Sequence, residues 1–326
     1  MTLAAGAGGL GVALEPQAGA RLLRSIAIVT HCVERLDVAR TAWTGIPGYV
    51  VIAEGTLDAA TCTAWDTPAA LGQRWCLLQP ASGDDCYLRF IETGERGHAP
   101  PASCGWSATE LLVTDVDALA RELDGSGFER LGGPGDLYSR PNAPRAMQVI
   151  GPSGELVYFT RLLPGGSRYG LKQAQSRVDR PFIVTIGSPD GAAMHRFYGD
   201  ALGLRIMDRT PFMNGILAFL CDVPPHTVFP TAVVSVPGRR FLIELDEFPA
   251  HIGPRRRRPG HLPPGMSMVS FRVASLDALT GLAFRAPPRP LAGPVYEGRR
   301  VAVAAGAAGE WLELLETGAD QRAGAS

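Results

Sequence analysis

One order of hydrophobic and polar positions recurs along the chain: an apolar run, a polar or acidic turn, and an amphipathic segment. The clearest copy spans 182–204, FIVTIGSPDGAAMHRFYGDALGL. Its apolar start predicts a strand, and the apolar residues after the turn recur at roughly helical spacing. Ser188 or Asp190 suits the N-cap of that helix, and Gly203 suits a left-handed stop. This segment therefore predicts a strand, a turn and a helix in direct succession.

Three other segments repeat this order. They span 25–43, 108–131 and 267–279, and the helix of the last copy is short and poorly marked. The four copies begin near residues 25, 108, 182 and 267. Recurrence of one strand–helix opening at such intervals predicts four modules of the same kind.

Each module also closes with a strand rich in apolar residues. These closing strands are expected at 85–93, 154–162, 239–248 and 310–317, and glycine-containing turns precede several of them. A strand, a helix and further strands joined by hairpin turns imply mixed α+β layers and not a parallel, doubly wound sheet. The fold class that we predict is therefore α+β.

The strand–turn–helix segments resemble the opening βα unit of the vicinal oxygen chelate superfamily, which includes glyoxalase I, bleomycin-resistance proteins and extradiol dioxygenases. The resemblance extends from about residue 21 to residue 318. It implies four repeated βαβββ modules in two halves, which form mixed, strongly curved sheets flanked by helices. Because this superfamily carries out many reactions, the resemblance indicates architecture more strongly than chemistry.

The polar, turn-rich segment LLPGGSRYGLKQAQSRVDRP at 162–181 separates the two halves. We predict the following organisation along the chain: a tail at 1–20, a first domain at 21–165 (modules near 25–100 and 105–163), a linker at 166–180, a second domain at 181–318 (modules near 181–250 and 265–318), and a tail at 319–326.

Composition narrows the functional classes. The net charge of −1 argues against nucleic acid as a partner, and the run Arg255–Arg258 is expected to form an exposed loop. No apolar run approaches the ~18 residues of a membrane helix, and the chain start lacks the pattern of a signal peptide. The six scattered cysteines are expected to be reduced thiols in a cytoplasmic protein. A monomer and a homodimer are both compatible with four modules.

Glu244 and Glu313 stand where closing strands of metal-using relatives supply a glutamate ligand. Strand alternation places both on the face opposite the helix-packed one, so we expect them to point into one shared concave sheet. The resemblance also implies a His or Gln near the start of each first strand. Those positions hold Ser25, a residue near Ala108, Pro181 or Ile183, and Met268. We therefore expect no cofactor, and a divalent metal, if bound, would rest weakly on Glu244 and Glu313.

Without a metal, two carboxylates that face one apolar cup repel each other, so the pKa of one should rise toward the range of a general acid or base. Arg272 offers the alternative, in which an arginine neutralises the pair and the glutamates are structural or binding residues. The remaining residues of this face form either an adaptable wall for a flat organic ligand or ordinary core packing. They are Met266, Met268, Ser270 and Trp311.

Three functions stay open. The first is an enzyme of isomerase, lyase or ring-cleavage type, which acts by acid/base chemistry on a small aromatic or carbonyl-containing molecule with Glu244 and Glu313 as catalytic residues. The second is a binding protein that sequesters a small molecule without changing it. The third is a dioxygenase-like metal enzyme with atypical ligands. The converging carboxylates favour the first.

Overall fold

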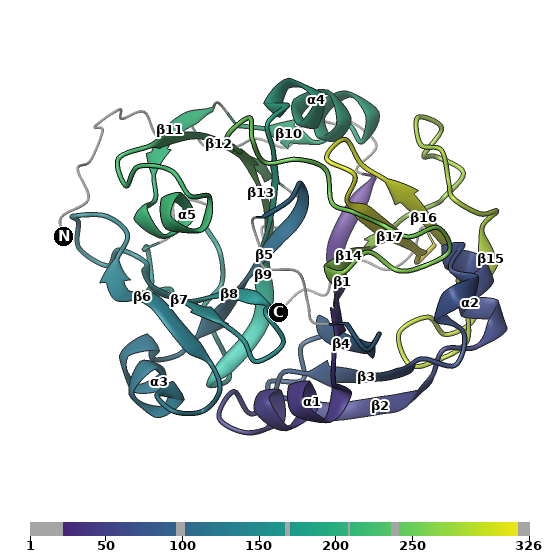
Figure 1. Ribbon diagram of the computed structural model, residues 1–326, viewed down its shortest axis with the longest axis horizontal. Coiled ribbons are helices and arrows are strands. Elements are labelled where there is room, and N and C mark those ends of the chain that lie inside the picture. The colour runs from purple at the N-terminus through teal and green to yellow at the C-terminus, as the bar shows by residue number, and fades with distance from the viewer. Residues whose placement is uncertain (1–21, 96–101, 167–169, 208, 236–240, 319–326) are drawn as a thin grey trace.

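The computed structural model describes residues 22–95, 102–166, 170–207, 209–235 and 241–318. Two curved, mixed β-sheets lie side by side, with helices around them (Figure 1). The α+β class and the strongly curved sheets predicted from the sequence are confirmed. The predicted tails at 1–20 and 319–326 lie outside the described residues.

Sheet A has eight strands in the described chain. From one edge to the other they are β15 (Arg289–Pro290), β16 (Arg300–Ala305), β17 (Trp311–Glu316), β14 (Gly265–Val273), β1 (Leu23–Val33), β4 (Tyr87–Glu92), β3 (Arg74–Gln79) and β2 (Val50–Thr56). Its concave face, here called cup A, opens toward α2 (Ala59–Trp65).

Sheet B repeats this layout. Its strands are β10 (Arg205–Ile206), β12 (Val228–Ser235), β13 (Leu242–Glu247), β9 (Val178–Ser188), β5 (Gly105–Val113), β8 (Leu156–Arg161), β7 (Arg145–Ile150) and β6 (Glu129–Asp136), with β11 (Thr210–Met213) paired to β12. Its concave face, cup B, lies beside α5 (Gly215–Leu220).

The sheets join the modules in an order that the sequence did not predict. In each module the closing strand pairs in parallel with one edge of the opening strand. The other edge of the opening strand pairs antiparallel with the opening strand of another module, β1 with β14 and β5 with β9. Sheet A therefore combines the first and fourth modules, and sheet B the second and third. The domain limits at 21–165 and 181–318 stay a prediction about the chain, and β9 begins inside the expected linker.

Three of the four predicted module helices are present: α1 (Leu36–Thr44), α3 (Val116–Leu123) and α4 (Gly191–His195), which continues into a π-helical turn, η2 (Arg196–Ala201). Asp190 caps α4 by accepting a hydrogen bond from the Ala193 amide (2.8 Å), and Gly203 has the predicted left-handed backbone (φ +62°). The prediction of a fourth helix is wrong. Residues 274–283 form turns, in which the Leu279 amide donates a hydrogen bond to the Leu276 carbonyl. The 3-10 turn Pro68–Ala70 follows α2.

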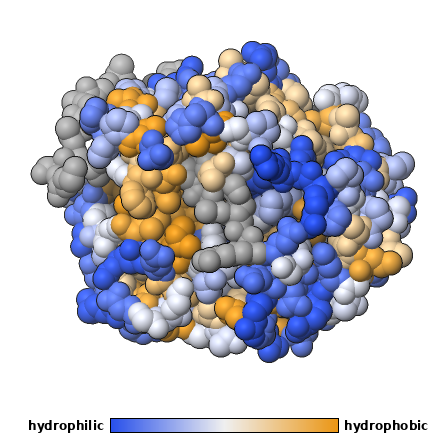
Figure 2. Space-filling model, in the orientation of Figure 1, coloured by the Kyte–Doolittle hydropathy of each residue, from blue (hydrophilic) through white to orange (hydrophobic). Residues whose placement is uncertain are grey.

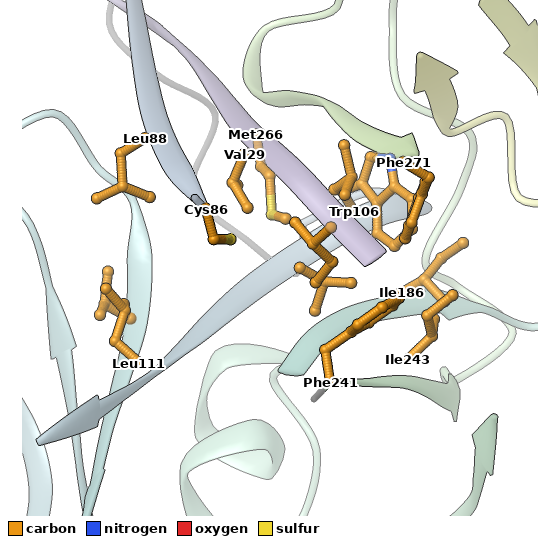
Figure 3. Close-up of a cluster of buried hydrophobic side chains, with 14 of the residues drawn as sticks. Val29, Cys86, Leu88, Trp106, Leu111, Ile186, Phe241, Ile243, Met266 and Phe271 are labelled. Carbon is orange, nitrogen blue, oxygen red and sulfur yellow. The ribbon is translucent and has the colours of Figure 1, made fainter. Parts of the chain in front are cut away.

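The main core fills the space between the two sheets. Val29 and Phe271 from sheet A meet Trp106, Ile186 and neighbouring apolar side chains of sheet B there (Figure 3). Burial of these rings and branched side chains supplies most of the favourable free energy of folding. A second apolar cluster lies under α2 in cup A, and a small third one lies on sheet B. All six cysteines are buried and free, as expected.

A buried glutamate ties successive modules together twice. Trp43 of α1 donates its indole N–H to Glu155 Oε1 (2.9 Å), and the Tyr198 hydroxyl donates to Glu310 Oε1 (2.9 Å). Each glutamate also accepts a backbone N–H in the turn before its closing strand. Burial raises the pKa of both carboxyls, that of Glu310 to about 7. These contacts link the first module to the second and the third to the fourth.

None of the helices in the described part of the chain has the length and apolar character needed to cross a bilayer. On the surface, an apolar strip lies on the same side of the molecule as α5 (Figure 2). Met213 of β11, Phe219 of α5 and Val228 of β12 are among the exposed large apolar side chains.

Candidate functional site

The floor of cup A holds a buried ion pair between Arg89 on β4 and Glu313 on β17. The guanidinium NH2 lies 3.1 Å from Glu313 Oε2, and the side chains are 5% and 0% exposed. Strand alternation explains why both point into the cup: the flanking Leu88, Phe90, Leu312 and Leu314 belong to the core between the sheets. An ion pair this deeply buried must be well hydrogen-bonded to be tolerated.

Four donors satisfy the Glu313 carboxylate. Oε1 accepts hydrogen bonds from the Trp65 indole N–H (2.7 Å) and the Tyr296 hydroxyl (2.8 Å). Oε2 accepts from Arg89 and from the Ser270 hydroxyl. We call Arg89, Glu313 and their partners Thr30, Trp65, Ser270 and Tyr296 the floor network. Glu313 therefore has no oxygen left without a protein donor.

Arg89 is held from several sides. Its Nε donates to Thr30 Oγ1 (3.0 Å), its NH1 donates to the Tyr296 hydroxyl, and its guanidinium carbon lies 4.6 Å from the centre of the Trp65 ring. Burial opposes its charge, but the neighbouring Tyr296 and Glu313 oxygens outweigh this and raise the pKa of Arg89. Burial also raises the pKa of Tyr296. The network thus combines a permanent cation with a carboxylate.

The strand register shows that the floor network is built from equivalent positions of two modules. Thr30 on β1 pairs with Arg89 on β4, and Ser270 on β14 pairs with Glu313 on β17. Ile28 and Ser270 face each other across the β1–β14 ladder. Arg89 therefore occupies in the first module the place that Glu313 occupies in the fourth.

A cavity of about 90 Å³ opens onto this floor. Trp65, Trp75 and Tyr296 provide aromatic surface, and Arg89 and Asp58 provide charge. A hydrogen bond from the Thr61 amide lowers the pKa of Asp58, so this carboxylate is charged at neutral pH. The remaining lining residues are Ile28, Thr56, Leu57, Thr61, Leu77, Ala292, Gly293, Pro294 and Val295. The site is thus an aromatic pocket over a charge-balanced polar floor.

Some residues predicted for the site do meet. Ser270 and Glu313 are hydrogen-bonded, and Met268 and Trp311 belong to the apolar cluster of cup A. Arg285 stacks over the Trp311 ring, with its guanidinium carbon 4.0 Å from the centroid. Glu313 belongs to the ion pair itself, and of Ser270, Met268 and Trp311 only Ser270 contacts the pair by a described hydrogen bond.

The other three are elsewhere. A bulge in the β1–β14 ladder turns Met266 into the core between the sheets, where Thr109 Oγ1 lies 3.6 Å from its sulfur (Figure 3). Arg272 binds the Ile26 carbonyl (3.1 Å) and Asp85, so Arg89 is the arginine that neutralises Glu313. Glu244 lies in sheet B, and the cup predicted to be shared by Glu244 and Glu313 is therefore wrong.

Cup B carries carboxylates at the positions that correspond to the floor network. Glu110 pairs with Tyr158, and Thr185 pairs with Glu244. Burial raises the pKa of Glu110 to about 7, although a hydrogen bond from Thr160 opposes this. Burial, and then the charges of Asp246 and Glu110, raise the pKa of Glu244 well above its usual value. Burial also raises the pKa of Asp246 to about 6.

The two cups differ in charge. In cup A a guanidinium stands where cup B has the Tyr158 phenol, and Thr30 stands where cup B has Glu110. Among the described residues, no lysine or arginine is hydrogen-bonded to Glu110 or Glu244. The repulsion expected between Glu244 and Glu313 therefore does not arise, and the carboxyls that act on Glu244 are Asp246 and then Glu110.

Neither cup fits a divalent metal in its present form. In the part of the chain that the structure describes, no three His, Cys, Asp or Glu side chains are grouped closely enough to hold a metal ion. In cup A, Glu313 is the one carboxylate of the floor network, and its oxygens already accept four hydrogen bonds. A cation there would also lie beside the guanidinium of Arg89, which repels it.

Several residues of the site were not predicted from the sequence. Asp58, Trp65 and Arg89 belong to the first module, and Tyr296 lies in a loop of the fourth. Arg89 lies in the first closing strand, and the alternation Leu88–Arg89–Phe90 is the signal in the sequence that places it on the face opposite the core. Asp58 before AATCTAW is a helix-start signal for α2, which carries Trp65 at its end. Tyr296 sits in a loop and has no periodic signal.

The arginine run lies partly inside the protein. Arg255 donates to the Met266 carbonyl (2.8 Å) and to the Trp106 carbonyl (2.6 Å), and so joins β14 to β5. Arg258 pairs with Glu95 at the surface. The expected exposed loop is therefore confirmed for Arg256, Arg257 and Arg258, whereas Arg255 is a structural residue.

The chain shares its fold with solved structures of glyoxalase I and of a dioxygenase-like protein. Glyoxalase I from Zea mays is 14% identical with a TM-score of 0.60, over 89% of this chain and 92% of that one. A variant of the same enzyme gives 13% identity and a TM-score of 0.61, over 89% and 93%. A Bacillus subtilis protein assigned as a dioxygenase gives 11% and 0.58, over 92% and 87%.

No family model and no curated protein sequence matches the chain. The structural matches cover nearly the whole chain, which has the four-module fold of the vicinal oxygen chelate superfamily. The resemblance predicted from the sequence is thereby confirmed for the fold. Identities of 11–15% leave the reaction and the ligand to be argued from the site itself.

Proposed function

We propose that cup A binds a small organic molecule and releases it unchanged. The observation that carries this proposal is the saturated Glu313 carboxylate. A general base must have a lone pair within reach of the proton it removes, and a general acid must have a proton to give. Glu313 instead accepts four hydrogen bonds and balances the charge of Arg89. The pocket offers surface for binding without a free acid or base at its floor.

The pocket surface indicates a flat, mainly apolar ligand. Trp65, Trp75 and Tyr296 line one cavity together with aliphatic side chains. Aromatic rings bury large areas and favour stacked or edge-on contact with another ring. The polar groups at the floor and at Asp58 would then fix the orientation of the ligand, as a few polar groups do in most small-molecule sites.

A binding and recovery experiment tests this proposal. Planar carbonyl compounds would be titrated into the protein with tryptophan fluorescence as the readout, and the bound compound would be recovered and identified by mass spectrometry. We expect Trp75→Ala to weaken binding at least tenfold. Leu71→Ala is the matched control, since Leu71 is 59% exposed and does not line the pocket. Recovery of a converted compound would contradict the proposal.

A second candidate is acid/base catalysis in cup B. It is favoured by the raised pKa of Glu110 and of Glu244, which would keep one carboxyl protonated near neutral pH. The chemistry suggested by the sequence, proton transfer on an aromatic or carbonyl compound, would then belong to these two residues. Glu313 would have no part in it.

Proton exchange distinguishes this candidate from simple binding. A catalyst of this type should exchange hydrogen next to a carbonyl group for deuterium in heavy water, as followed by NMR. Glu244→Gln should abolish the exchange. Glu247→Gln is the control, because Glu247 lies on the same strand and pairs with Arg209 at the surface. Exchange that survives Glu244→Gln would rule the candidate out.

One chain completes both cups, because each sheet takes its strands from two modules of the same molecule. We therefore propose that a monomer is sufficient for function. Analytical ultracentrifugation checks this, and ligand binding that appears only in a dimer would contradict it.

A further inference from the structure

We propose that Arg89 is a built-in cation in the place of a divalent metal, which keeps metals out of cup A and offers N–H groups to an oxygen atom of the ligand. The exclusion of metals stands on the floor network alone. The contact with a ligand oxygen rests in addition on the proposed binding function.

The floor network lies at the centre of sheet A. Thr30, Arg89, Ser270 and Glu313 are the register partners at the centre of the two halves of sheet A. The resemblance to metal-using members of the superfamily implies metal ligands at these places, a His or Gln on the first strand and a Glu on the last. Here two hydroxyls replace the first-strand ligands, and the Arg89 guanidinium replaces one of the two closing-strand carboxylates.

The charges of Arg89 and Glu313 cancel each other. Arg89 and Glu313 are both at most 5% exposed and have opposite charges, so the floor is neutral as it stands. Removing either charge leaves the other uncompensated in a region of low dielectric, which is strongly unfavourable. A divalent cation would have to displace the guanidinium from Glu313 and remain beside it. Like charges at such short range repel strongly when water is excluded.

Arg89 has more N–H donors than the floor network uses. A guanidinium has five N–H groups. Thr30, Tyr296 and Glu313 each take one, so two have no partner among the described residues. Arg89 nevertheless lines the cavity. The Trp65 ring stacked on the guanidinium holds its plane, so a ligand oxygen in the cavity would accept from a fixed donor.

The charge and the size of the cavity limit the class of ligand. The neutral floor offers no net positive charge to an anion, and the Asp58 carboxylate in the same lining repels one. The cavity has a volume of about 90 Å³. It can hold a carbonyl group with the adjoining edge of a ring. The inferred ligand is therefore a neutral aromatic ketone or aldehyde.

Metal binding tests the first part directly. The double variant Thr30→His/Ser270→His keeps Arg89, and the triple variant adds Arg89→Met. Both present two imidazoles and Glu313. Calorimetric titration with Ni²⁺ should show one bound ion per chain with micromolar or tighter affinity for the triple variant, and at least a hundredfold weaker binding for the double variant. Equal binding by the two would overturn the exclusion of metals by Arg89.

The wild-type protein provides a test that does not depend on the folding of variants. Ni²⁺ should not bind stoichiometrically in cup A, and the thermal unfolding midpoint should not change when chelator is added. One Ni²⁺ per chain that quenches the fluorescence of the wild type but not that of Trp65→Phe would overturn the proposal.

Matched probes test the second part. Acetophenone should bind at least tenfold more tightly than α-methylstyrene, which has a similar shape but no oxygen, and more tightly than benzoate. Arg89→Lys should remove this preference, because an ammonium group lacks the planar fork. Equal binding of acetophenone and α-methylstyrene would overturn the oxygen contact but leave the binding function intact. Failure of every compound to bind would instead contradict the binding function, with the metal titrations unaffected.

Discussion

Arg89 and Glu313 meet across three strand intervals of sheet A, although 224 residues separate them in the sequence. Neighbouring strands lie about 4.8 Å apart, so β4 and β17 of a flat sheet would be about 14 Å apart. The curvature of the sheet and the length of the arginine side chain bring NH2 to 3.1 Å from Oε2. The contact is therefore a direct product of the cup.

Removing the guanidinium should strongly destabilise the protein. We expect Arg89→Met to lower the free energy of unfolding by about 3–5 kcal/mol, because Glu313 would remain as an uncompensated buried charge. Adding Glu313→Gln should recover part of that loss. Urea denaturation of the two single variants and the double variant measures the coupling. A double variant as unstable as the sum of the single ones would show that the two residues do not act as a pair.

The link between the third and fourth modules should depend on one hydroxyl. Tyr198→Phe deletes the donor to the buried Glu310 and should cost about 1–3 kcal/mol of unfolding free energy. Tyr138→Phe is a suitable control, because Tyr138 is 44% exposed. Chemical denaturation at pH 8, where Glu310 is ionised in the folded protein, gives the largest effect.

Glu110 should make stability fall as pH rises. Its pKa is raised to about 7 in the folded protein, so between about pH 4.5 and 7 the folded state holds a proton that the unfolded state has lost. Glu110→Gln removes this dependence. Relative to wild type, the variant should gain roughly 3 kcal/mol between pH 4 and pH 8. A constant difference across that range would show that Glu110 titrates normally.

His31 should make the stability of the protein fall as pH falls, opposite to the effect of Glu110. Burial, and then the positive charge of Arg255, lower its pKa to about 4, and its Nδ1 has no hydrogen-bond partner among the residues that the structure describes. From about pH 6.5 down to pH 4 the unfolded state takes up a proton that folded His31 does not, so stability is lost as pH falls. His31→Phe, beside Phe90, should remove roughly 3 kcal/mol of that loss. Denaturation curves at pH 4, 5, 6 and 7 provide the check.

The faces of the closing strands could be read from alternation. Leu312 and Leu314 lie in the main core, and Trp311 and Glu313 point into cup A, as the period of two requires. The same rule failed for Met266, because a bulge in the β1–β14 ladder interrupts the alternation. A bulge depends on the partner strand and leaves no trace in the local pattern.

The choice of site partners could not be read in this way. Glu244 and Glu313 occupy equivalent places in successive modules, which suggested one shared cup. The free edge of each opening strand selects its neighbour in three dimensions, and β14 pairs with β1 rather than with β9. Glu313 consequently faces Arg89 from the first module, and Glu244 faces Glu110 from the second.

The sequence alone was enough to predict three of the four strand–helix units, the closing strands and the α+β class, because these follow from local periodicity and turn chemistry. It also determined that a glutamate of the fourth module faces a concave sheet. Which modules share a sheet, and therefore which charges meet, could be learned only from the three-dimensional structure. Strand pairing between distant modules and the curvature of the sheet are long-range properties, and they convert an expected pair of carboxylates into the ion pair of Arg89 and Glu313.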